Sequence, residues 1–369
     1  MLTIIRFKIK VMINYIAHWE KILLQSRSEI VINLENREFK AICPIENKTI
    51  IEEYYMDSVD WKIDRTNFID FSSIINLTKI LKKEPLNSVF HIFTLKSGFY
   101  FMISNMFLRK NFHNILSITG LGFLFSKSKR AFIIKIFLRP LFVYLINDTF
   151  QVIIFQNSND KLVFEKYTKY KNRSEIVPGS GINVNQYKLK NTFNEKTKII
   201  FAGRLLIDKG VKEFIKIAES MNSSNLEFYL AGEIDKGNPK SISEIELESI
   251  KNNTCINYLG YIDIKNELKN YDILLSLSEH EGFSRILLEA AYVGLFCVAY
   301  NNPGIHFLSE LENTEIFFNK HKEDIILKLN TILKKEKFIS IKNRNIIENK
   351  YSTDVVASYF EKIYRSLNE

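Results

Sequence analysis

The regular alternation of strand-like and helix-like runs is the feature that most limits how this chain can fold. From about residue 195 onward, apolar runs of strand length alternate with amphipathic runs of helical length. The strand-like runs include TKIIFAGR (197–204), LEFYLAGE (226–233) and DILLSLSE (272–279), and the helix-like runs include KGVKEFIKIAESM (209–221) and SRILLEAAYVG (284–294). This alternation predicts a doubly wound α/β domain whose ligands bind at the carboxyl ends of parallel strands.

The first half of the chain shows a similar but less regular pattern. Runs typical of strands occupy residues 28–34, 87–95, 114–120 and 151–157. A helix is predicted over 127–147, with Pro140 as a kink or break. The glycine-rich turn at 175–187 and the polar run after it indicate a domain boundary. We therefore expect one domain over 1–185, a second over 190–350 and an amphipathic helix over 351–369.

Composition agrees with a two-domain globular protein. The chain has 369 residues, of which 46% are hydrophobic. A chain of this length is too long for one typical core. Its three cysteines are far apart, so we expect neither a disulfide framework nor a cysteine zinc site. A reducing compartment is therefore expected. Neither a signal peptide nor an apolar stretch of about 18 residues is seen, so we expect a cytoplasmic chain without a spanning helix.

A long stretch without acidic residues stands out in the first half. No aspartate or glutamate occurs between Glu84 and Asp148, and basic residues in the second part of this stretch alternate with bulky apolar ones. The basic residues are Lys96, Arg109, Lys110, Lys127, Lys129, Arg130, Lys135 and Arg139. We interpret residues 85–147 as a surface that lies on an anionic membrane. The alternative is a buried helix with a solvated basic edge, and no recognisable module supports binding to nucleic acid.

Two glutamates mark a candidate anion site in the second half. Strand-like DILLSLSE leads into the turn HEGF, and a helix follows, with Glu281 in the turn and Glu289 two helical turns further on. The first turn of a helix attracts phosphate, and Gly282 lets the backbone approach such a ligand closely. Two carboxylates beside an anion suit a ligand with two separated groups of hydroxyls. An ordinary capped helix with two solvated glutamates is the alternative.

A second turn carries two cations. GRLLIDKG (203–210) follows a strand and precedes a helix, which places Arg204 and Lys209 on either side of one turn. Two fixed cations at a strand end suit a diphosphate. Both turns on one parallel sheet together predict a site for a nucleotide-diphosphate sugar. The spacing is neither that of a dinucleotide-binding turn nor that of a P-loop.

The second half resembles retaining glycosyltransferases of family 4. The matching segments are FAGRLLIDKGVKEFI, LAGEIDKGNPKSIS, YLGYID, YDILLSLSEHEGFSRILLEAA and YNNPG. This resemblance implies the GT-B fold, in which two Rossmann-like domains face each other and a last helix packs back on the N-terminal domain. Segments at 87–98, 117–123, 153–157 and 177–183 resemble a branch that adds sugars to polyprenyl-diphosphate-linked oligosaccharides. Those enzymes commonly use UDP-sugars to build O-antigen, capsule or glycan precursors at the inner face of the cell membrane.

The resemblance also implies roles for individual residues. Arg204 and Lys209 would bind the donor diphosphate, Glu281 would hold the transferred sugar, and these three are the expected catalytic residues. Glu289 would hold the ribose and Tyr261 would lie near the base. The backbone of 282–284 would contact phosphate. The full donor set is Gly203, Tyr261, Gly282, Phe283, Ser284 and Glu289, and the expected acceptor cleft contains Lys96, Thr119, Gly120 and Gly122.

The sequence departs from the family pattern at three places. The first 25 residues do not show a clear strand followed by a glycine loop, which puts the acceptor loop in doubt. Thr119 stands where many members carry a histidine near the reacting centre, and His91 and His113 do not fill that position. We interpret His91, in an apolar strand, as a packing residue. Phe307 stands near the place of the usual acidic residue after YNNPG.

The expected reaction is a retaining transfer by front-face attack. It needs no protein nucleophile, because cations can stabilise the leaving diphosphate while the diphosphate takes the proton of the acceptor. No D-x-D pair occurs, so we expect no catalytic metal and no cofactor besides the sugar donor, which we expect to be UDP-linked. Two alternatives remain open: an epimerase that acts on free UDP-sugar, and a non-catalytic member that binds nucleotide sugar.

Overall fold

The computed structural model describes residues 12–34, 37–65, 70–121, 129–221, 223–335 and 339–367, with the backbone alone for 129–138. The chain divides into two compact units, which we call unit 1 and unit 2. Unit 1 comprises residues 1–180 and 356–369, and unit 2 comprises residues 181–355. The division falls inside the glycine-rich segment 175–187. There Gly181 has a φ of +67°, and a Cβ would lie 2.8 Å from the carbonyl carbon of Ser352, so the close approach requires glycine.

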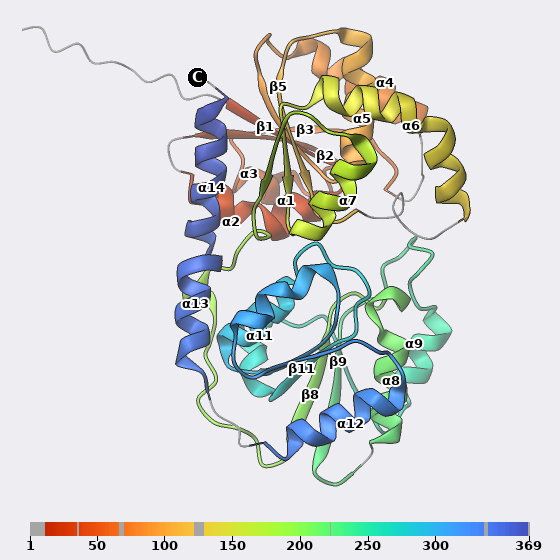
Figure 1. Ribbon diagram of the computed structural model, residues 1–369, viewed down its shortest axis with the longest axis vertical. Coiled ribbons are helices and arrows are strands. Elements are labelled where there is room, and N and C mark those ends of the chain that lie inside the picture. The colour runs from red at the N-terminus through yellow and green to blue at the C-terminus, as the bar shows by residue number, and fades with distance from the viewer. Residues whose placement is uncertain are drawn as a thin grey trace, which may run out of the picture. The chain divides into compact units, whose positions relative to one another are not determined.

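Unit 1 is built on a seven-stranded parallel sheet with the order β3-β2-β1-β4-β5-β6-β7 (Figure 1). Its strands are β1 (Met12–Ala17), β2 (Glu38–Cys43), β3 (Asp57–Asp60), β4 (Val89–Phe93), β5 (His113–Ile118), β6 (Val152–Phe155) and β7 (Arg173–Ile176). Its helices are α1 (Glu20–Ser26), α2 (Ser28–Ile32), α3 (Lys48–Glu52), α4 (Phe71–Lys83), α5 (Leu95–Leu108), α6 (Lys129–Thr149), α7 (Ser158–Thr168) and most of α14 (Thr353–Ser366). Pro140 lies inside α6, where a helix was expected.

The sheet of unit 1 is covered on both faces because its central strands are apolar on both sides. Successive residues of β1 alternate between two cores: Tyr15 packs in one and Ile16 in the other. The first core contains residues of α1, α2, α3 and α14, and the second contains residues of α4, α5, α6 and α7. Both cores reach the carboxyl ends of the strands, so the loops there rest on a rigid base.

Residues 28–34, expected to form a strand, instead form the short helix α2. Ile30 and Val31 of this segment are buried in the first core of unit 1, beside α1. A short apolar run with β-branched residues fits a buried strand and a buried helix equally well, and tertiary packing decides between them. Strand β1 precedes this segment and lies inside the sheet, between β2 and β4.

A chain of buried hydroxyl and imidazole groups joins α14 to the sheet of unit 1. The hydroxyl of Tyr364 lies 2.8 Å from that of Tyr15 and 2.6 Å from Nδ1 of His91, whose Nε2 lies 2.7 Å from Oγ of Ser117. All four side chains are almost fully buried. His91 is therefore part of the core, which agrees with its interpretation as a packing residue.

Unit 2 is a second doubly wound domain, with a six-stranded parallel sheet in the order β10-β9-β8-β11-β12-β13 (Figure 1). Its strands are β8 (Thr197–Ala202), β9 (Leu226–Ala231), β10 (Asn257–Gly260), β11 (Ile273–Ser276), β12 (Phe296–Tyr300) and β13 (Thr314–Phe317). Its α-helices are α8 (Val211–Ser220), α9 (Glu244–Lys251), α10 (Ile264–Glu267), α11 (Arg285–Val293), α12 (Lys322–Leu333) and α13 (Ile341–Tyr351). Short 3₁₀ turns are η2 (Val184–Gln186), η3 (Ile207–Lys209), η4 (Leu268–Asn270) and η5 (Pro303–Glu310).

Candidate active site

The strand order of unit 2 places two loops at the point where the sheet changes direction. From β8 the chain proceeds outward through β9 and β10, and from β11 it proceeds the opposite way through β12 and β13. Because β8 and β11 are parallel neighbours, their following loops leave the same edge side by side. Such a crevice is where open α/β sheets bind ligands. The loops are the two that the sequence singled out, 203–210 and 277–284.

Lys209 and Glu281 meet across this point. Nζ of Lys209 lies 2.5 Å from Oε1 of Glu281, and both side chains are mostly buried. The backbone N–H of Glu279 also donates to the carbonyl of Asp208, at 3.0 Å, so the two loops are tied through main chain as well. The structure thus brings together a cation and a carboxylate that are 72 positions apart in sequence.

Two glycines permit this close packing of loops. Gly210 follows Lys209 with a φ of +82°, and a Cβ there would lie 2.3 Å from Cβ of Leu277. A Cβ on Gly304, in the turn η5 after β12, would lie 2.5 Å from Cβ of Glu281. Neither distance is tolerated by real side chains. Glycine at both positions therefore fixes where Lys209 and Glu281 lie.

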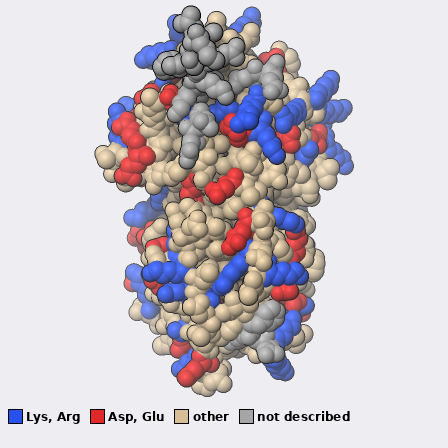
Figure 2. Space-filling model, turned by 90° about the vertical axis from the view of Figure 1, so that its left-hand side faces the viewer, with Lys and Arg blue, Asp and Glu red and all other residues tan. Residues whose placement is uncertain are grey.

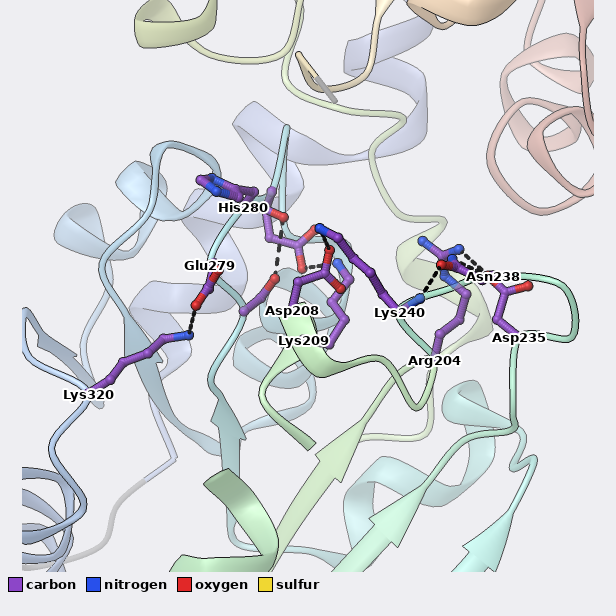
Figure 3. Close-up of polar contacts among 11 residues, drawn as sticks. Arg204, Asp208, Lys209, Asp235, Asn238, Lys240, Glu279, His280 and Lys320 are labelled. Carbon is purple, nitrogen blue, oxygen red and sulfur yellow. Dashed lines mark hydrogen bonds and ion pairs between the residues drawn. The ribbon is translucent and has the colours of Figure 1, made fainter. Parts of the chain in front are cut away.

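Arg204 is held by the loop after β9, whose residues had no predicted role in the site. Nη1 of Arg204 lies 2.7 Å from Oδ2 of Asp235, which also accepts a hydrogen bond from Asn238. Lys240, from the same loop after β9, lies 2.9 Å from Oδ2 of Asp208 (Figure 3). These contacts orient Arg204 and Asp208. A carboxylate three residues after the strand LEFYLAG is the signal in the sequence that could have indicated a partner for Arg204.

Glu289 lies deeper than Glu281 and has different partners. Its Oε1 accepts hydrogen bonds from the hydroxyl of Tyr187, at 2.7 Å, and from Nε of Arg285, at 2.8 Å. Burial, together with the negative charge of Glu289, raises the pKa of Tyr187 well above its usual value. No hydrogen bond or ion pair within the described ranges joins Glu289 to Lys209 or Glu281. The two glutamates therefore form two separate acceptor positions along α11 and the turn before it.

Ser284 is the N-cap residue of α11, and its hydroxyl does not cap the helix. Its backbone N–H donates to the carbonyl of Gly304, at 3.0 Å. Its Oγ is buried and has no hydrogen-bond partner in the described part of the chain. A buried hydroxyl without a partner is costly unless a ligand completes it. The start of α11 also carries the partial positive charge of a helix, so an anionic group is the ligand that fits here.

The remaining expected donor residues surround this edge. Gly203 follows β8, and its carbonyl lies so close to Gly232 that any side chain on Gly232 would collide with it. The ring of Phe283 stacks on that of Phe307, with centroids 4.8 Å apart. Phe307 thus has a packing role where an acidic residue was expected. Tyr261 follows β10, two strands from β8, and its side chain is largely exposed.

In unit 1 the expected acceptor residues lie at the carboxyl ends of two neighbouring strands. Thr119 and Gly120 follow β5, and Lys96 lies in the first turn of α5, after β4. Nζ of Lys96 donates to the carbonyls of Asp64 and Arg65, and burial lowers the pKa of Lys96 to about 8. Gly122 lies outside the described residues.

One further polar cluster at this edge was missed in the sequence. His18 follows β1, and its ring contacts the hydroxyls of Thr94 and Ser97. The sequence there has no glycine-containing loop, and the short apolar run that forms β1 follows a segment with several basic residues. The signal that could have revealed it is a histidine at the end of the apolar run MINYIA.

The cations of the 85–147 stretch are partly structural. Lys110 donates to the carbonyls of Lys82 and Glu84 at the end of α4, and Arg139 donates to the carbonyl of Tyr167. Lys127 lies outside the described residues, as do the side chains of Lys129, Arg130 and Lys135. None of the helices in the described part of the chain is long and apolar enough to cross a membrane. Those same ranges hold no cluster of three or more His, Cys, Asp or Glu side chains suited to a metal ion.

Comparison with known families identifies the C-terminal part. Residues 184–353 match the family described as "Glycosyl transferases group 1", and this range contains every expected donor residue. This part of the chain is a group 1 glycosyltransferase domain. No curated protein matched this glycosyltransferase.

Solved structures share the fold of the chain over almost its whole length. Sucrose-phosphate synthase from Thermosynechococcus elongatus aligns with a TM-score of 0.77 at 12% identity, over 97% of this chain and 99% of that one. Alr3699/HepE from Anabaena, in complex with UDP and glucose, aligns with a TM-score of 0.75 at 14% identity, over 96% and 99%. The lipopolysaccharide outer core galactosyltransferase WaaB aligns with a TM-score of 0.64 at 14% identity, over 96% and 99%. The predicted GT-B fold is confirmed.

Proposed function

We propose that this group 1 glycosyltransferase moves a hexose or N-acetylhexosamine from a UDP-sugar to a polyprenyl-diphosphate-linked saccharide, with retention of configuration. The product would serve the synthesis of surface polysaccharide such as O-antigen or capsule. The observation that carries this proposal is the Lys209–Glu281 pair at the point where the sheet of unit 2 changes direction. A cation for phosphate and a carboxylate for hydroxyls lie there side by side.

Several features support a UDP-sugar as the donor. Alr3699/HepE has been solved in complex with UDP-glucose, and it shares the fold at 14% identity. In the described part of this chain the hydroxyl of Ser284 has no partner, so it and the start of α11 suit a phosphate group. Arg204 and Lys209 supply positive charge from the loop after β8, the strand beside β11. Glu281 then accepts hydrogen bonds from the sugar, and Glu289 from the ribose.

The chemistry needs only charge stabilisation and positioning. The bond from the anomeric carbon to the diphosphate breaks, and the acceptor oxygen bonds to that carbon on the same face. The acceptor proton passes to the leaving diphosphate oxygen. Lys209 and Arg204 stabilise the negative charge that develops on the diphosphate. Loss of one such charged contact lowers the rate roughly 10²–10³-fold. When the donor binds, the ammonium group of Lys209 leaves its ion pair with Glu281 and contacts a phosphate group instead.

We assign the acceptor to unit 1 and its contact with a membrane to the 85–147 stretch. Met106 and Phe107 at the end of α5 and Leu141 and Tyr144 of α6 expose apolar side chains, and α5 contacts α6. Apolar side chains that insert and basic ones that attract anionic lipid together suit peripheral binding at the inner face of the cell membrane. On the face that Figure 2 shows, acidic and basic side chains are mixed.

The decisive experiment is transfer to a defined lipid acceptor. The chain is incubated with polyprenyl-diphosphate N-acetylglucosamine and each of several nucleotide sugars, and UDP release and product mass are followed. A gain of one hexose or N-acetylhexosamine on the lipid, only with a UDP-sugar, is the expected result. Interconversion of UDP-sugars without a lipid product would contradict the proposal, and so would use of another nucleotide.

A further inference from the structure

The sheet of unit 1 has its own point of reversal, and a polar cluster occupies it. Strands β1 and β4 are parallel neighbours, with β2 and β3 beyond β1 and with β5, β6 and β7 beyond β4. Their following loops therefore leave one edge side by side, as the loops after β8 and β11 do in unit 2. His18 comes from the loop after β1, and Thr94 and Ser97 come from the start of α5, after β4.

The three side chains form a closed triangle. Nδ1 of His18 lies 2.9 Å from Oγ1 of Thr94 and 3.2 Å from Oγ of Ser97, and the two hydroxyls are 3.3 Å apart. The backbone N–H of His18 also donates to Oγ of Ser97, at 3.0 Å. Ser97 is fully buried. The imidazole is therefore fixed through one nitrogen and through its own backbone.

The triangle depends on an unusual backbone conformation. Thr94 has a φ of +78° and a ψ of 151°, which a β-branched residue rarely adopts. Its N–H donates to the carbonyl of Ser117 at 2.8 Å, and its side chain caps α5 by accepting from the N–H of Ser97. Strain of this kind persists where the surrounding structure holds it, and it is concentrated at functional sites.

The other nitrogen of His18 is available to a ligand. Within the described ranges, Nε2 of His18 has no hydrogen-bond partner, and the side chain is partly exposed. Burial, with the positive charges of Lys96 and Arg65, lowers the pKa of His18 to about 3. The imidazole is thus neutral at physiological pH and offers one hydrogen-bonding atom.

A single neutral atom suits a hydroxyl rather than a phosphate. A phosphate needs several donors or cations at once. The two nearest cations are engaged elsewhere, because Lys96 donates to two carbonyls and the guanidinium of Arg65 lies 4.4 Å from the centre of the Trp19 ring. We propose that His18, positioned by Thr94 and Ser97, binds a hydroxyl group of the saccharide acceptor through Nε2. This inference rests on the proposed function and names the acceptor contact within unit 1.

Two substitutions separate this role from a structural one. An asparagine amide ends near the position of Nδ1, whereas a glutamine amide ends near that of Nε2. His18→Asn thus keeps the contact to Thr94 and Ser97, and His18→Gln keeps the contact to the acceptor. His113→Gln is the matched control, because His113 begins β5 and so lies at the opposite edge of the sheet.

The test compares these variants with the unchanged chain. We would measure kcat/KM for polyprenyl-diphosphate N-acetylglucosamine at saturating UDP-sugar, and UDP affinity by calorimetry. We expect His18→Asn to lower kcat/KM about 10- to 100-fold, as loss of one well-placed hydrogen bond does, with UDP affinity unchanged within about twofold. His18→Gln should retain most of the activity, and His113→Gln all of it.

Three results would overturn the inference. Equal activity of all variants would show that Nε2 makes no contact that matters. Loss in His18→Gln with retention in His18→Asn would assign His18 a purely structural role. A fall in UDP affinity equal to the fall in kcat/KM would assign it to the donor. A wild-type chain that binds no UDP or glycosylates no lipid would instead overturn the proposed function, and the inference with it.

Discussion

Nζ of Lys209 and Oε1 of Glu281 lie 2.5 Å apart, and each comes from the loop that follows one of the two central strands of unit 2. Each group therefore holds the other in place before any ligand arrives. The same two groups have the charges that a diphosphate and a sugar require. The donor site is therefore preorganised by this ion pair.

Lys209→Met should lower transfer from UDP-sugar roughly 10²–10³-fold while the chain stays folded, because the charge that stabilises the leaving diphosphate is lost. Glu281→Gln and Arg204→Ala should cause losses of the same kind. The measurement is UDP release at fixed donor concentration, with circular dichroism to verify folding. Lys328→Met is a matched control, since Lys328 on α12 forms an ion pair of equal length with Glu315 of β13. Full activity in Lys209→Met would contradict the site.

Ser284→Ala should affect stability and binding in opposite directions. Removing a buried hydroxyl without a partner should raise the free energy of unfolding by roughly 1 kcal/mol. If that hydroxyl binds phosphate, affinity for UDP should fall about 5- to 10-fold. Thermal unfolding and calorimetry with UDP measure the two effects. A variant that is less stable and binds UDP normally would show that Ser284 is structural.

Gly304→Ala should disturb the donor site from outside the loop that contains Glu281. The new Cβ would lie 2.5 Å from Cβ of Glu281 and 2.6 Å from its carbonyl oxygen, so Glu281 must move. Displacement of a positioning group by about 1 Å can cost about 10²-fold in rate. We expect that loss in transfer, measured beside Gly98→Ala in unit 1, where a Cβ would contact the terminal methyl groups of Leu116 rather than backbone. Equal activity in both variants would contradict the argument.

The stability of unit 1 should fall as pH falls below about 6.5. Burial and the charge of Arg27 hold the pKa of His91 well below its ordinary value. Below pH 6.5 the unfolded chain therefore binds a proton that the folded chain does not, and the free energy of unfolding falls by about 1.4 kcal/mol per pH unit for this residue. Both tryptophans, Trp19 and Trp61, belong to unit 1, so urea titration with tryptophan fluorescence reports on this unit.

His91→Gln should flatten this dependence between pH 6.5 and 5, by about 1.4 kcal/mol per pH unit. It should also lower stability at pH 7.5, because the hydrogen bonds to Tyr364 and Ser117 are disturbed. A wild-type chain whose stability does not change over this range would refute the assignment of a neutral His91.

Phe107→Ser should weaken binding to vesicles that contain phosphatidylserine by about tenfold, because an exposed aromatic side chain contributes most of its effect by insertion. Sedimentation with vesicles measures it. Lys110→Met should instead lower the stability of unit 1 and leave vesicle binding nearly unchanged, since Lys110 is engaged with carbonyls at the end of α4. The reverse pattern would assign membrane attraction to Lys110.

The sequence predicted unit 2 better than unit 1, for reasons that lie in particular segments. Central strands such as β8 (TKIIFA) and β11 (ILLS) are mostly apolar because both faces are buried, and a run of this kind is easily recognised as a strand. Edge strands β3 (DSVD) and β7 (RSEI) are short and polar, because one side meets solvent, and they have no clear signal. The segment 28–34 has the composition of a strand and was predicted wrongly.

Site residues could be predicted from the sequence where they belong to a motif, but the side chains with which they pair could not. Arg204 and Lys209 stand out beside a strand end, and Glu281 precedes an apolar helix. That Glu281 pairs with Lys209, and that Asp235 holds Arg204, depends on the order of strands in the sheet. His18 was missed because its role arises only when β1 and β4 become neighbours.

The place of α14 has a consequence for how the chain is made. Val356, Phe360 and Tyr364 of this helix fill the first core of unit 1, which is therefore built from two segments that flank unit 2 in the sequence. During synthesis the first core must stay incomplete until α14 leaves the ribosome, and every strand of unit 2 emerges before that. The strands of unit 1 are thus translated first, but their first core is completed last, when α14 becomes available.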